Sequence, residues 1–214
     1  MSPKNPKKAK LFDISRIPMD LARLVCSCLL PIYRVKRITP EGEKYREKIH
    51  GGAIIAANHS SFSDPFAVGV TFWYRRMFFL VAEVVMGGFI RSLLLKGVGA
   101  IKIDRAAADV EAIKKCIKVL KDGRLLTVFP QGGITDTKDV ETIKSGAALI
   151  ALRAGVPIIP IHICPRPHWY SRLTVVIGKT IYPDKICKKK MPSTRDLNEI
   201  SDILMAEMNR CNLQ

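Results

Sequence analysis

The sequence lacks a long hydrophobic run near its N-terminus and shows no pattern of paired cysteines. The uncharged stretch over residues 24–33 is about half of the ~20 residues that span a bilayer, and Pro31 interrupts it. Residues 1–8 are polar and basic, and no apolar stretch with a cleavage site follows promptly, so we expect no cleavable signal peptide. The six cysteines show no disulfide framework, which fits a reducing compartment. We therefore expect the chain to stay in the cytosol.

Acidic residues are also scarce. The chain has 19 Asp and Glu against 35 Lys and Arg, and its net charge is +16. A positive field of this size favours partners that carry phosphate, namely anionic lipid or nucleic acid. Nucleic-acid binders usually cluster basic residues with interleaved aromatics, whereas here the charge is spread and the aromatics lie in apolar runs. We expect an anionic membrane surface and no nucleic acid, and keep a nucleic-acid-binding protein as the alternative from another class.

Two groups of potential metal ligands have weak spacing. Cys26 and Cys28 fall inside an apolar helical pattern, and His162 and Cys164 alternate along an expected strand upstream of His168. Neither pattern is typical of a metal site, so we expect no metal and no resident cofactor.

A helical period begins at Asp13. Its apolar side carries Ile14, Ile17, Leu21, Leu24, Val25 and Cys28, and its polar side carries Asp13, Arg16, Asp20, Arg23 and Ser27. The apolar side could lie in a membrane interface or pack on the rest of the protein, and the basic residues on both flanks favour lipid. We expect residues 1–34 to form a basic tail and an interface helix, and residues 35–214 to form one catalytic domain.

Apolar strands alternate with helices over the rest of the chain. Strands are expected over residues 33–39, 53–57, 77–81, 98–103, 125–129, 158–163 and 173–177. Helices are expected over residues 65–74, 106–121 and 142–154, with short buried helices within 84–95 and a final helix beginning near Ser193. This alternation predicts a single α/β domain with a largely parallel central sheet flanked by helices.

Four polar or glycine-containing stretches lie at strand ends, over residues 58–64, 99–105, 129–133 and 156–161. Ligands of open α/β sheets bind where the carboxyl ends of strands meet loops and helix starts. In the first stretch, a carboxylate from Asp64 on one nitrogen of His59 would leave the other nitrogen free to take a proton. Asp64 also precedes Pro65, which predicts that it caps the following helix; a cap alone would explain the residue equally well.

These four stretches together resemble the conserved blocks of glycerolipid acyltransferases of the lysophosphatidic acid acyltransferase type, the NHxxxxD family. Asn58, His59 and Asp64 match the first block, and the strand that ends in Asp104-Arg105 resembles the second. Phe129-Pro130-x-Gly132 resembles the third block and Val156-Pro157-Ile158-Ile159-Pro160 the fourth. The resemblance implies acyl transfer from an acyl thioester to a hydroxyl, with His59 as general base and Asp64 as the group that orients it.

The resemblance also implies the substrates and their contacts. The donor would be acyl-CoA or an acyl carrier protein, and the acceptor a lysophospholipid, 1-acyl-sn-glycerol 3-phosphate first and glycerol 3-phosphate or another lyso-lipid second. Arg105 is expected to bind the acceptor phosphate, helped by Lys102, and the backbone of Gly132 and Gly133 to bind acceptor or oxyanion. Without the resemblance, Arg105 would be assigned to a surface ion pair.

The third block departs from the family pattern of Phe-Pro-Glu-Gly-Thr-Arg. Gln131 replaces the glutamate, Gly133 the threonine and Ile134 the arginine. Gln131 can donate or accept a hydrogen bond but cannot pair with a cation, and Lys144 is a candidate to replace the lost positive charge. The departure bears on which acceptor is used, and it keeps open a catalytically silent lipid-binding relative. We expect a peripheral or monotopic enzyme on the cytoplasmic face of the cell membrane.

Overall fold

The computed structural model describes residues 17–61, 63–82, 89–104, 109–130, 137–166, 168, 171–189 and 192–212. Its strands are β1 (Lys36–Ile38), β2 (Ala53–Ala57), β3 (Met77–Ala82), β4 (Ala100–Ile103), β5 (Leu125–Val128), β6 (Ile158–Ile163) and β7 (Thr174–Ile177). Its helices are α1 (Ile17–Tyr33), α2 (Asp64–Thr71), α3 (Phe89–Gly97), α4 (Val110–Lys121), α5 (Thr137–Ala154), α6 (Pro183–Ile186) and α7 (Thr194–Asn212).

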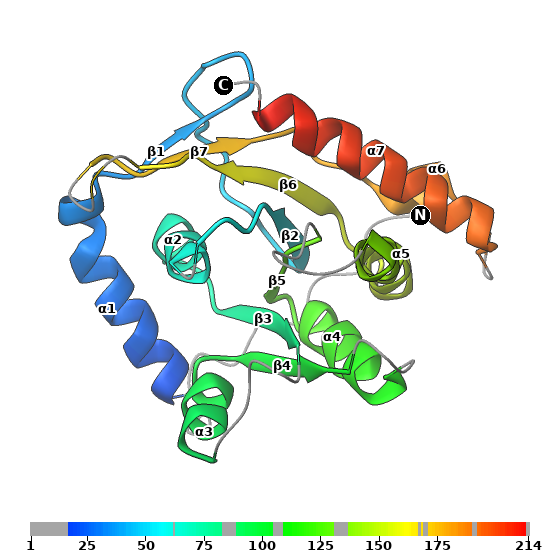
Figure 1. The fold of residues 1–214 in the computed structure, drawn as a ribbon, viewed down its shortest axis with the longest axis horizontal. Helices are drawn as coiled ribbons and strands as arrows, with labels where there is room; N and C mark the ends of the chain where they lie inside the picture. Colours follow the sequence, from blue (N-terminus) through cyan, green and yellow to red (C-terminus); the bar gives the residue numbers. More distant parts are fainter. Residues whose placement is uncertain are drawn as a thin grey trace.

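The strands form one seven-stranded sheet in the order β1-β7-β6-β2-β5-β3-β4 (Figure 1). The five strands from β6 to β4 in that order are parallel to one another. β7 runs antiparallel to β6, and β1 is parallel to β7. The carboxyl ends of β2 to β6 therefore lie at the same edge of the sheet as the amino ends of β1 and β7. The predicted α/β fold with a largely parallel sheet is confirmed.

Helices cover both faces of the sheet (Figure 1). On one face, α4, α5 and α7 contribute Cys116, Ala148 and Leu204 to a core with Ile54 and Leu126 of the sheet. On the other face, α2 contributes its buried side chains to a second core with alternate residues of the same strands. Because β2 lies between two cores, all five of its residues are 0% exposed, and its sequence is continuously apolar.

A glycine allows close packing where α4 ends against the start of β2. A Cβ atom on Gly52 would lie 2.1 Å from the carbonyl oxygen of Leu120 in the last turn of α4. The helix ends at Lys121, and Gly123 has a φ of +73°, the left-handed conformation that glycine adopts without strain. The expected glycine stop of this helix is confirmed.

The side of α1 that carries Asp20 and Arg23 faces the domain, together with Met19, which is 6% exposed and belongs to the core, whereas the apolar row faces outward. Asp20 pairs with Arg76, and its Oδ1 lies 2.7 Å from Nε of that arginine. Arg23 donates to the carbonyl oxygens of Trp73 at 3.1 Å and Tyr74 at 3.3 Å. The outward row is 48–59% exposed and consists of Ile17, Leu21, Leu24, Val25 and Ile32. Packing of this row on the domain, one of the two interpretations of the pattern, is therefore wrong.

Some predicted boundaries are also wrong. Helix α1 continues through Pro31 to Tyr33 and ends where Arg34 adopts a φ of +44°, so the first strand is shorter than residues 33–39. Helix α5 begins five residues before the expected residue 142, and α2 ends before the expected residue 74. Within the described residues, no helix has the length and apolar content needed to cross a membrane.

Candidate active site

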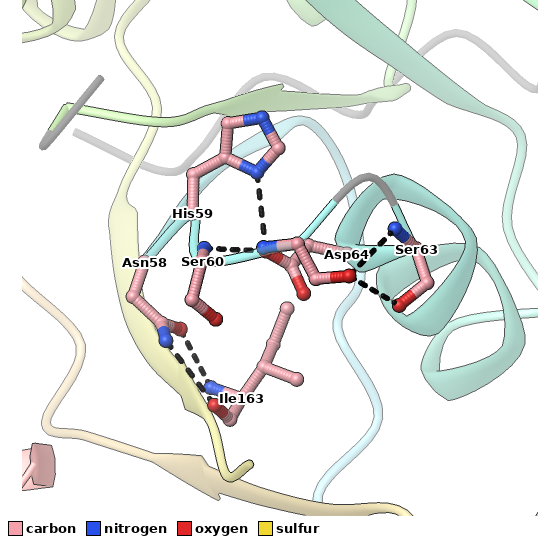
Figure 2. Close-up of polar contacts among 7 residues, drawn as sticks. Asn58, His59, Ser60, Ser63, Asp64 and Ile163 are labelled. Carbon is pink, nitrogen blue, oxygen red and sulfur yellow. Dashed lines mark hydrogen bonds and ion pairs between the residues drawn. The ribbon is translucent and has the colours of Figure 1, made fainter. Parts of the chain in front are cut away.

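The loop between β2 and α2 is held at its start by a pair of hydrogen bonds to β6. The side-chain oxygen of Asn58 accepts from the backbone N–H of Ile163 at 2.7 Å, and its amide nitrogen donates to the carbonyl of the same residue at 3.1 Å (Figure 2). Asn58 is 8% exposed, so both bonds form largely away from water. The end of β2 is thereby fixed to the end of β6 directly before His59.

The carboxylate of Asp64 gathers the rest of the loop around one oxygen atom. Its Oδ2 accepts from the backbone N–H groups of Ser60 and Ser61, each at 2.7 Å, and lies 3.1 Å from Nδ1 of His59 (Figure 2). The residue is 3% exposed, and a buried carboxylate is stable when several donors surround it. Asp64 therefore shapes the loop and holds the imidazole ring.

Asp64 does this from the first residue of α2, not as its cap. Ser63 occupies the N-cap position, and no side-chain hydrogen bond caps the helix. The prediction that Asp64 is the N-cap is wrong, because its carboxylate turns back to the loop, where its Oδ2 accepts hydrogen bonds from the N–H groups of Ser60 and Ser61. Pro65 lies in the first turn, as expected for a proline at a helix start.

This geometry assigns distinct roles to the two nitrogens of His59. A carboxylate accepts hydrogen bonds, so the Nδ1 atom that faces Asp64 carries the proton and Nε2 keeps a lone pair. The side chain of His59 is 32% exposed, whereas that of Asp64 is 4% exposed. Figure 2 shows Nε2 on the far side of the ring from Asp64. The pair can take a proton from a group that approaches from outside the loop.

Phe129, at the end of β5, packs against the histidine. The two rings are stacked with centroids 4.5 Å apart and planes inclined by 30°. β5 and β6 are the two neighbours of β2 in the sheet, so three strand ends meet around His59. Residues of the first block thus contact the first residue of the third block, Phe129, and the end of the fourth-block strand, Ile163.

The other predicted site residues are placed less fully. Lys102 is exposed on β4, which lies three places from β2 in the sheet. The pKa of Asp109 at the start of α4 is lowered first by the hydrogen bond from the backbone N–H of Ala112 and least by the charge of Lys102. The structure does not bring Lys102 next to His59. Lys144 lies in α5, but its side chain is outside the described residues, as are Arg105, Gln131, Gly132 and Gly133.

Two contacts were not anticipated from the sequence. The bridge from Asn58 to Ile163 spans 105 positions, and the stack of His59 on Phe129 also joins distant segments. A polar amide directly after a fully apolar strand was the available signal for the first contact. Among the described residues, no three His, Cys, Asp or Glu side chains gather in a way that could hold a metal ion.

Comparison with known families finds a match over the segment that contains this loop. The model of the family described as Acyltransferase matches residues 37–164, a segment that runs from β1 to the end of β6 and includes the whole loop. The chain belongs to the acyltransferase family. The resemblance of the four blocks is thereby confirmed, and helices α1 and α7 lie outside the matched segment.

Several curated acyltransferases are similar to this chain. The 1-acyl-sn-glycerol-3-phosphate acyltransferase of Bacillus subtilis is 33% identical over 110 residues, which cover 51% of this chain and 54% of that protein. The protein of the same name from Borreliella burgdorferi is 27% identical over 152 residues, covering 68% and 58% of the two chains. The chain thus spans about half the length of these relatives.

A solved acyltransferase shares the fold. The crystal structure of the 1-acyl-sn-glycerophosphate acyltransferase from Thermotoga maritima superposes with a TM-score of 0.54 at 17% identity, over 92% of this chain and 80% of that one. At this identity the likeness concerns the fold of the acyltransferase domain alone.

Proposed function

We propose that the protein transfers a fatty acyl group from an acyl thioester to the free hydroxyl of a lysophospholipid, with 1-acyl-sn-glycerol 3-phosphate as acceptor and phosphatidic acid as product. The observation that carries the proposal is the buried Asp64 carboxylate 3.1 Å from Nδ1 of a half-exposed His59. The names of the curated relatives support the acceptor.

Acyl transfer requires His59 to accept one proton from the acceptor hydroxyl and to give one proton to the leaving thiolate. Nε2 of His59 takes the proton of the acceptor hydroxyl while that oxygen attacks the thioester carbonyl carbon. The tetrahedral intermediate then expels the thiolate, which takes the proton back from the imidazolium. Asp64 stabilises the imidazolium between these steps and keeps Nδ1 protonated. Among the described residues, no hydrogen bond joins a serine hydroxyl of the loop to His59, and the hydroxyls of Ser61 and Ser63 lie 3.1 Å from each other.

Acceptor recognition is assigned to the residues that the family pattern identifies. Arg105 binds the phosphate as a planar, always charged fork, with Lys102 adding positive charge. The backbone of Gly132 and Gly133 binds the acceptor or the oxyanion, and Gln131 forms a hydrogen bond with an acceptor hydroxyl. Lys144 supplies the positive charge of the family's arginine, which Ile134 replaces in this chain. Glycerol 3-phosphate or another lyso-lipid is the alternative acceptor, because of Gln131.

The enzyme is further proposed to act at an anionic membrane, on its cytoplasmic face. The support is the orientation of α1, whose polar side is bonded to the domain while its apolar row stays exposed. A helix held in this way can lay its apolar row into a lipid interface without leaving the domain. The net charge of +16 strengthens attraction to anionic headgroups.

The decisive experiment measures thiol release from acyl-CoA and from acyl carrier protein with a panel of acceptors. Release is expected to depend on added 1-acyl-sn-glycerol 3-phosphate and to disappear in His59→Ala. The matched control is His50→Ala, since His50 is also exposed but lies before β2 at the opposite edge. Equal rates for wild type and His59→Ala across all acceptors would contradict the proposal. Arg105→Ala is expected to raise the acceptor KM, and an unchanged KM removes its phosphate role.

Membrane association is tested with vesicles of mixed zwitterionic and anionic phospholipid. Each buried leucine contributes on the order of 1 kcal/mol, so Leu21→Gln with Leu24→Gln is expected to weaken binding by about tenfold or more. Ile203→Gln is the control, because Ile203 is exposed on α7 at the other face of the sheet. Equal losses in the two proteins would show that the α1 row does not mediate binding.

A further inference from the structure

A pocket of about 560 Å³ lies beside the edge strand β1 and is strongly basic. Five cationic side chains line it, from Arg34, Lys36, Arg37, Lys44 and Arg172, together with the ring of Tyr45. No carboxylate among the described residues lines it. Such a pocket favours a ligand with several negative charges, and its volume exceeds that of a single ion.

The backbone brings these cations together from three segments. The chain turns back after β1, so that Ile38 bridges to Lys44 and the N–H of Tyr45 donates to the carbonyl of Arg37 at 3.0 Å. On the other side of β1, the N–H of Lys36 donates to the carbonyl of Leu173 at 2.8 Å, directly after Arg172. The pocket is therefore built by the regular pairing of β1 and not by one flexible loop.

The charges of the pocket are not neutralised by the part of the chain that the structure describes. Within the described part of the chain, none of its five cations forms an ion pair, and the nearby Glu41 is paired with Arg210 of α7. The Nη1 atom of Arg37 is buried and has no hydrogen-bond partner. A buried donor without a partner is costly, and a rotation of the Arg37 guanidinium toward the pocket would let an anion satisfy it.

Tyr45 adds a donor and no charge. Burial, followed by the charge of Glu47, raises the pKa of its phenol to about 12, although the cation of Arg37 opposes this shift. The hydroxyl therefore stays protonated over the physiological range and can donate to a phosphate oxygen.

The amino end of β1 lies at the same sheet edge as His59. Going from β2 through β6 and β7 to β1 crosses three strand spacings, about 14 Å. Tyr33, next to Arg34, has its ring 5.6 Å from that of Phe66, two residues after Asp64. An elongated ligand with phosphates at one end and a thioester at the other can span this distance.

We propose that this pocket binds the phosphate groups of the acyl donor, namely the adenosine 3′-phosphate 5′-diphosphate end of an acyl-CoA, while its thioester reaches His59. The inference rests on the proposed acyl transfer and assigns the donor class, which that proposal left open. A lipid headgroup carries fewer phosphate groups than the five cations of the pocket can bind. An acidic carrier protein would need a protruding basic surface, whereas this site is concave.

The test compares wild type with Arg37→Gln combined with Lys44→Gln, and with a second variant, Arg34→Gln combined with Arg172→Gln, in case the first folds poorly. The control is Lys115→Gln combined with Lys118→Gln, which removes the same charge from exposed positions on α4. Calorimetric titration with adenosine 3′,5′-bisphosphate and with CoA is expected to show at least tenfold weaker binding for the pocket variants and wild-type binding for the control.

Kinetics then separate the nucleotide from the thioester. The KM for acyl-CoA is expected to rise at least tenfold in the pocket variants, whereas the KM for an S-acyl-pantetheine, which lacks the nucleotide, should change less than twofold. Unchanged CoA affinity overturns the proposal, as does an equal rise in KM for both donors. If the pocket variants lose only their binding to anionic vesicles, the pocket binds lipid headgroups. If the KM rises only when acyl carrier protein is the donor, the pocket binds that protein. Either result overturns the proposal. If no acceptor is acylated, the titrations still decide the pocket's ligand.

Discussion

Replacing Asn58 with alanine removes both hydrogen bonds that join the end of β2 to the end of β6. The N–H and C=O of Ile163 then lose their partner at a position where Asn58 itself is buried. Each buried group left unsatisfied costs about 1–3 kcal/mol, so we expect Asn58→Ala to lower the free energy of unfolding by about 2–4 kcal/mol. That loss is a large fraction of the ~5–15 kcal/mol by which domains are stable, and the variant should still fold.

The same change should reduce the rate of acyl transfer more than substrate binding. His59 follows Asn58 directly, and the bond to β6 sets where the loop begins. A displacement of about 1 Å in a catalytic group can cost about 10²-fold in rate, so kcat should fall by that order while the KM values for donor and acceptor stay within about threefold. Asn58→Asp keeps the oxygen that accepts from Ile163 but places a charged carboxylate oxygen against the Ile163 carbonyl, so its unfolding free energy should fall at least as far as that of Asn58→Ala.

Urea denaturation and initial rates of thiol release measure the two effects. Ser201→Ala on α7 is the matched control, because it removes one largely buried hydrogen bond, from Oγ to the carbonyl of Leu197 at 2.8 Å, away from the loop. It should lose about 1 kcal/mol of stability and keep the wild-type rate. If Asn58→Ala unfolds within about 0.5 kcal/mol of wild type and keeps its kcat within about twofold, the bridge does not position His59.

Three further predictions concern Asp64, two glycines and the attachment of α1. Asp64→Asn keeps an oxygen for the loop N–H groups but cannot offset the imidazolium charge, so kcat should fall by about 10²–10⁴-fold, and a loss below tenfold would remove its electrostatic role. Gly52→Ala should lower the free energy of unfolding by at least about 1–3 kcal/mol, because its Cβ meets the Leu120 carbonyl. Gly146→Ala in α5 should raise the free energy of unfolding by about 0.5–1 kcal/mol, because its Cβ meets nothing within 4 Å. Urea denaturation of both variants shows whether the two changes have opposite signs. The hydrogen bond from Arg76 lowers the pKa of Asp20 against the effect of burial, so the stability of the α1 attachment is complete above the ordinary value of about 3.9 and is lost as pH falls through the lowered value. Fluorescence of Trp73, in a Trp169→Phe background, should report this acid release in wild type, and Asp20→Asn should abolish its pH dependence.

The sheet was predictable because strands that are buried on both faces are short, continuously apolar runs in the sequence. β2 and β6 are short apolar runs bounded by glycine, proline or polar residues, and the structure places both in the centre of the sheet. Helix ends were less predictable. Pro31 lacks only its own N–H bond to the preceding turn, while the N–H of Arg34 still donates to the carbonyl of Leu30 at 2.8 Å, so the helix continues past the proline.

The pair of His59 and Asp64 was predictable from the sequence, but the contacts of Ile163 and Phe129 with their loop were not. His59 and Asp64 are five residues apart, so one loop can join them whatever the rest of the fold does. Ile163 and Phe129 reach the loop only because β6 and β5 are the neighbours of β2, and strand order is not visible in a periodic pattern. The assignment of Asp64 as a helix cap failed for a related reason, since the same carboxylate had two sets of donors within reach.

The orientation of α1 shows the limit of amphipathic patterns. The pattern separates an apolar side from a polar side, and burial of the apolar side is the usual outcome. Here Asp20 and Arg23 find a guanidinium and two backbone carbonyls on the domain, so the polar side is the attached one. Which side faces inward was decided by partners that lie about fifty residues away in the sequence.

The reversal of direction between β6 and β7 connects these features. Because β7 is antiparallel to β6 and β1 is parallel to β7, the chain that leaves α1 enters β1 at the edge where β2 delivers His59. If β1 ran parallel to β2 instead, Arg34 and Lys36 would lie at the opposite edge, too far away for one donor to reach both the basic pocket and the histidine. The amino end of β1, with Arg34 and Lys36 of the basic pocket, and the catalytic loop therefore lie at the same edge of the sheet. A donor bound by its phosphates at β1 would present its thioester toward β2, where the acceptor hydroxyl meets His59.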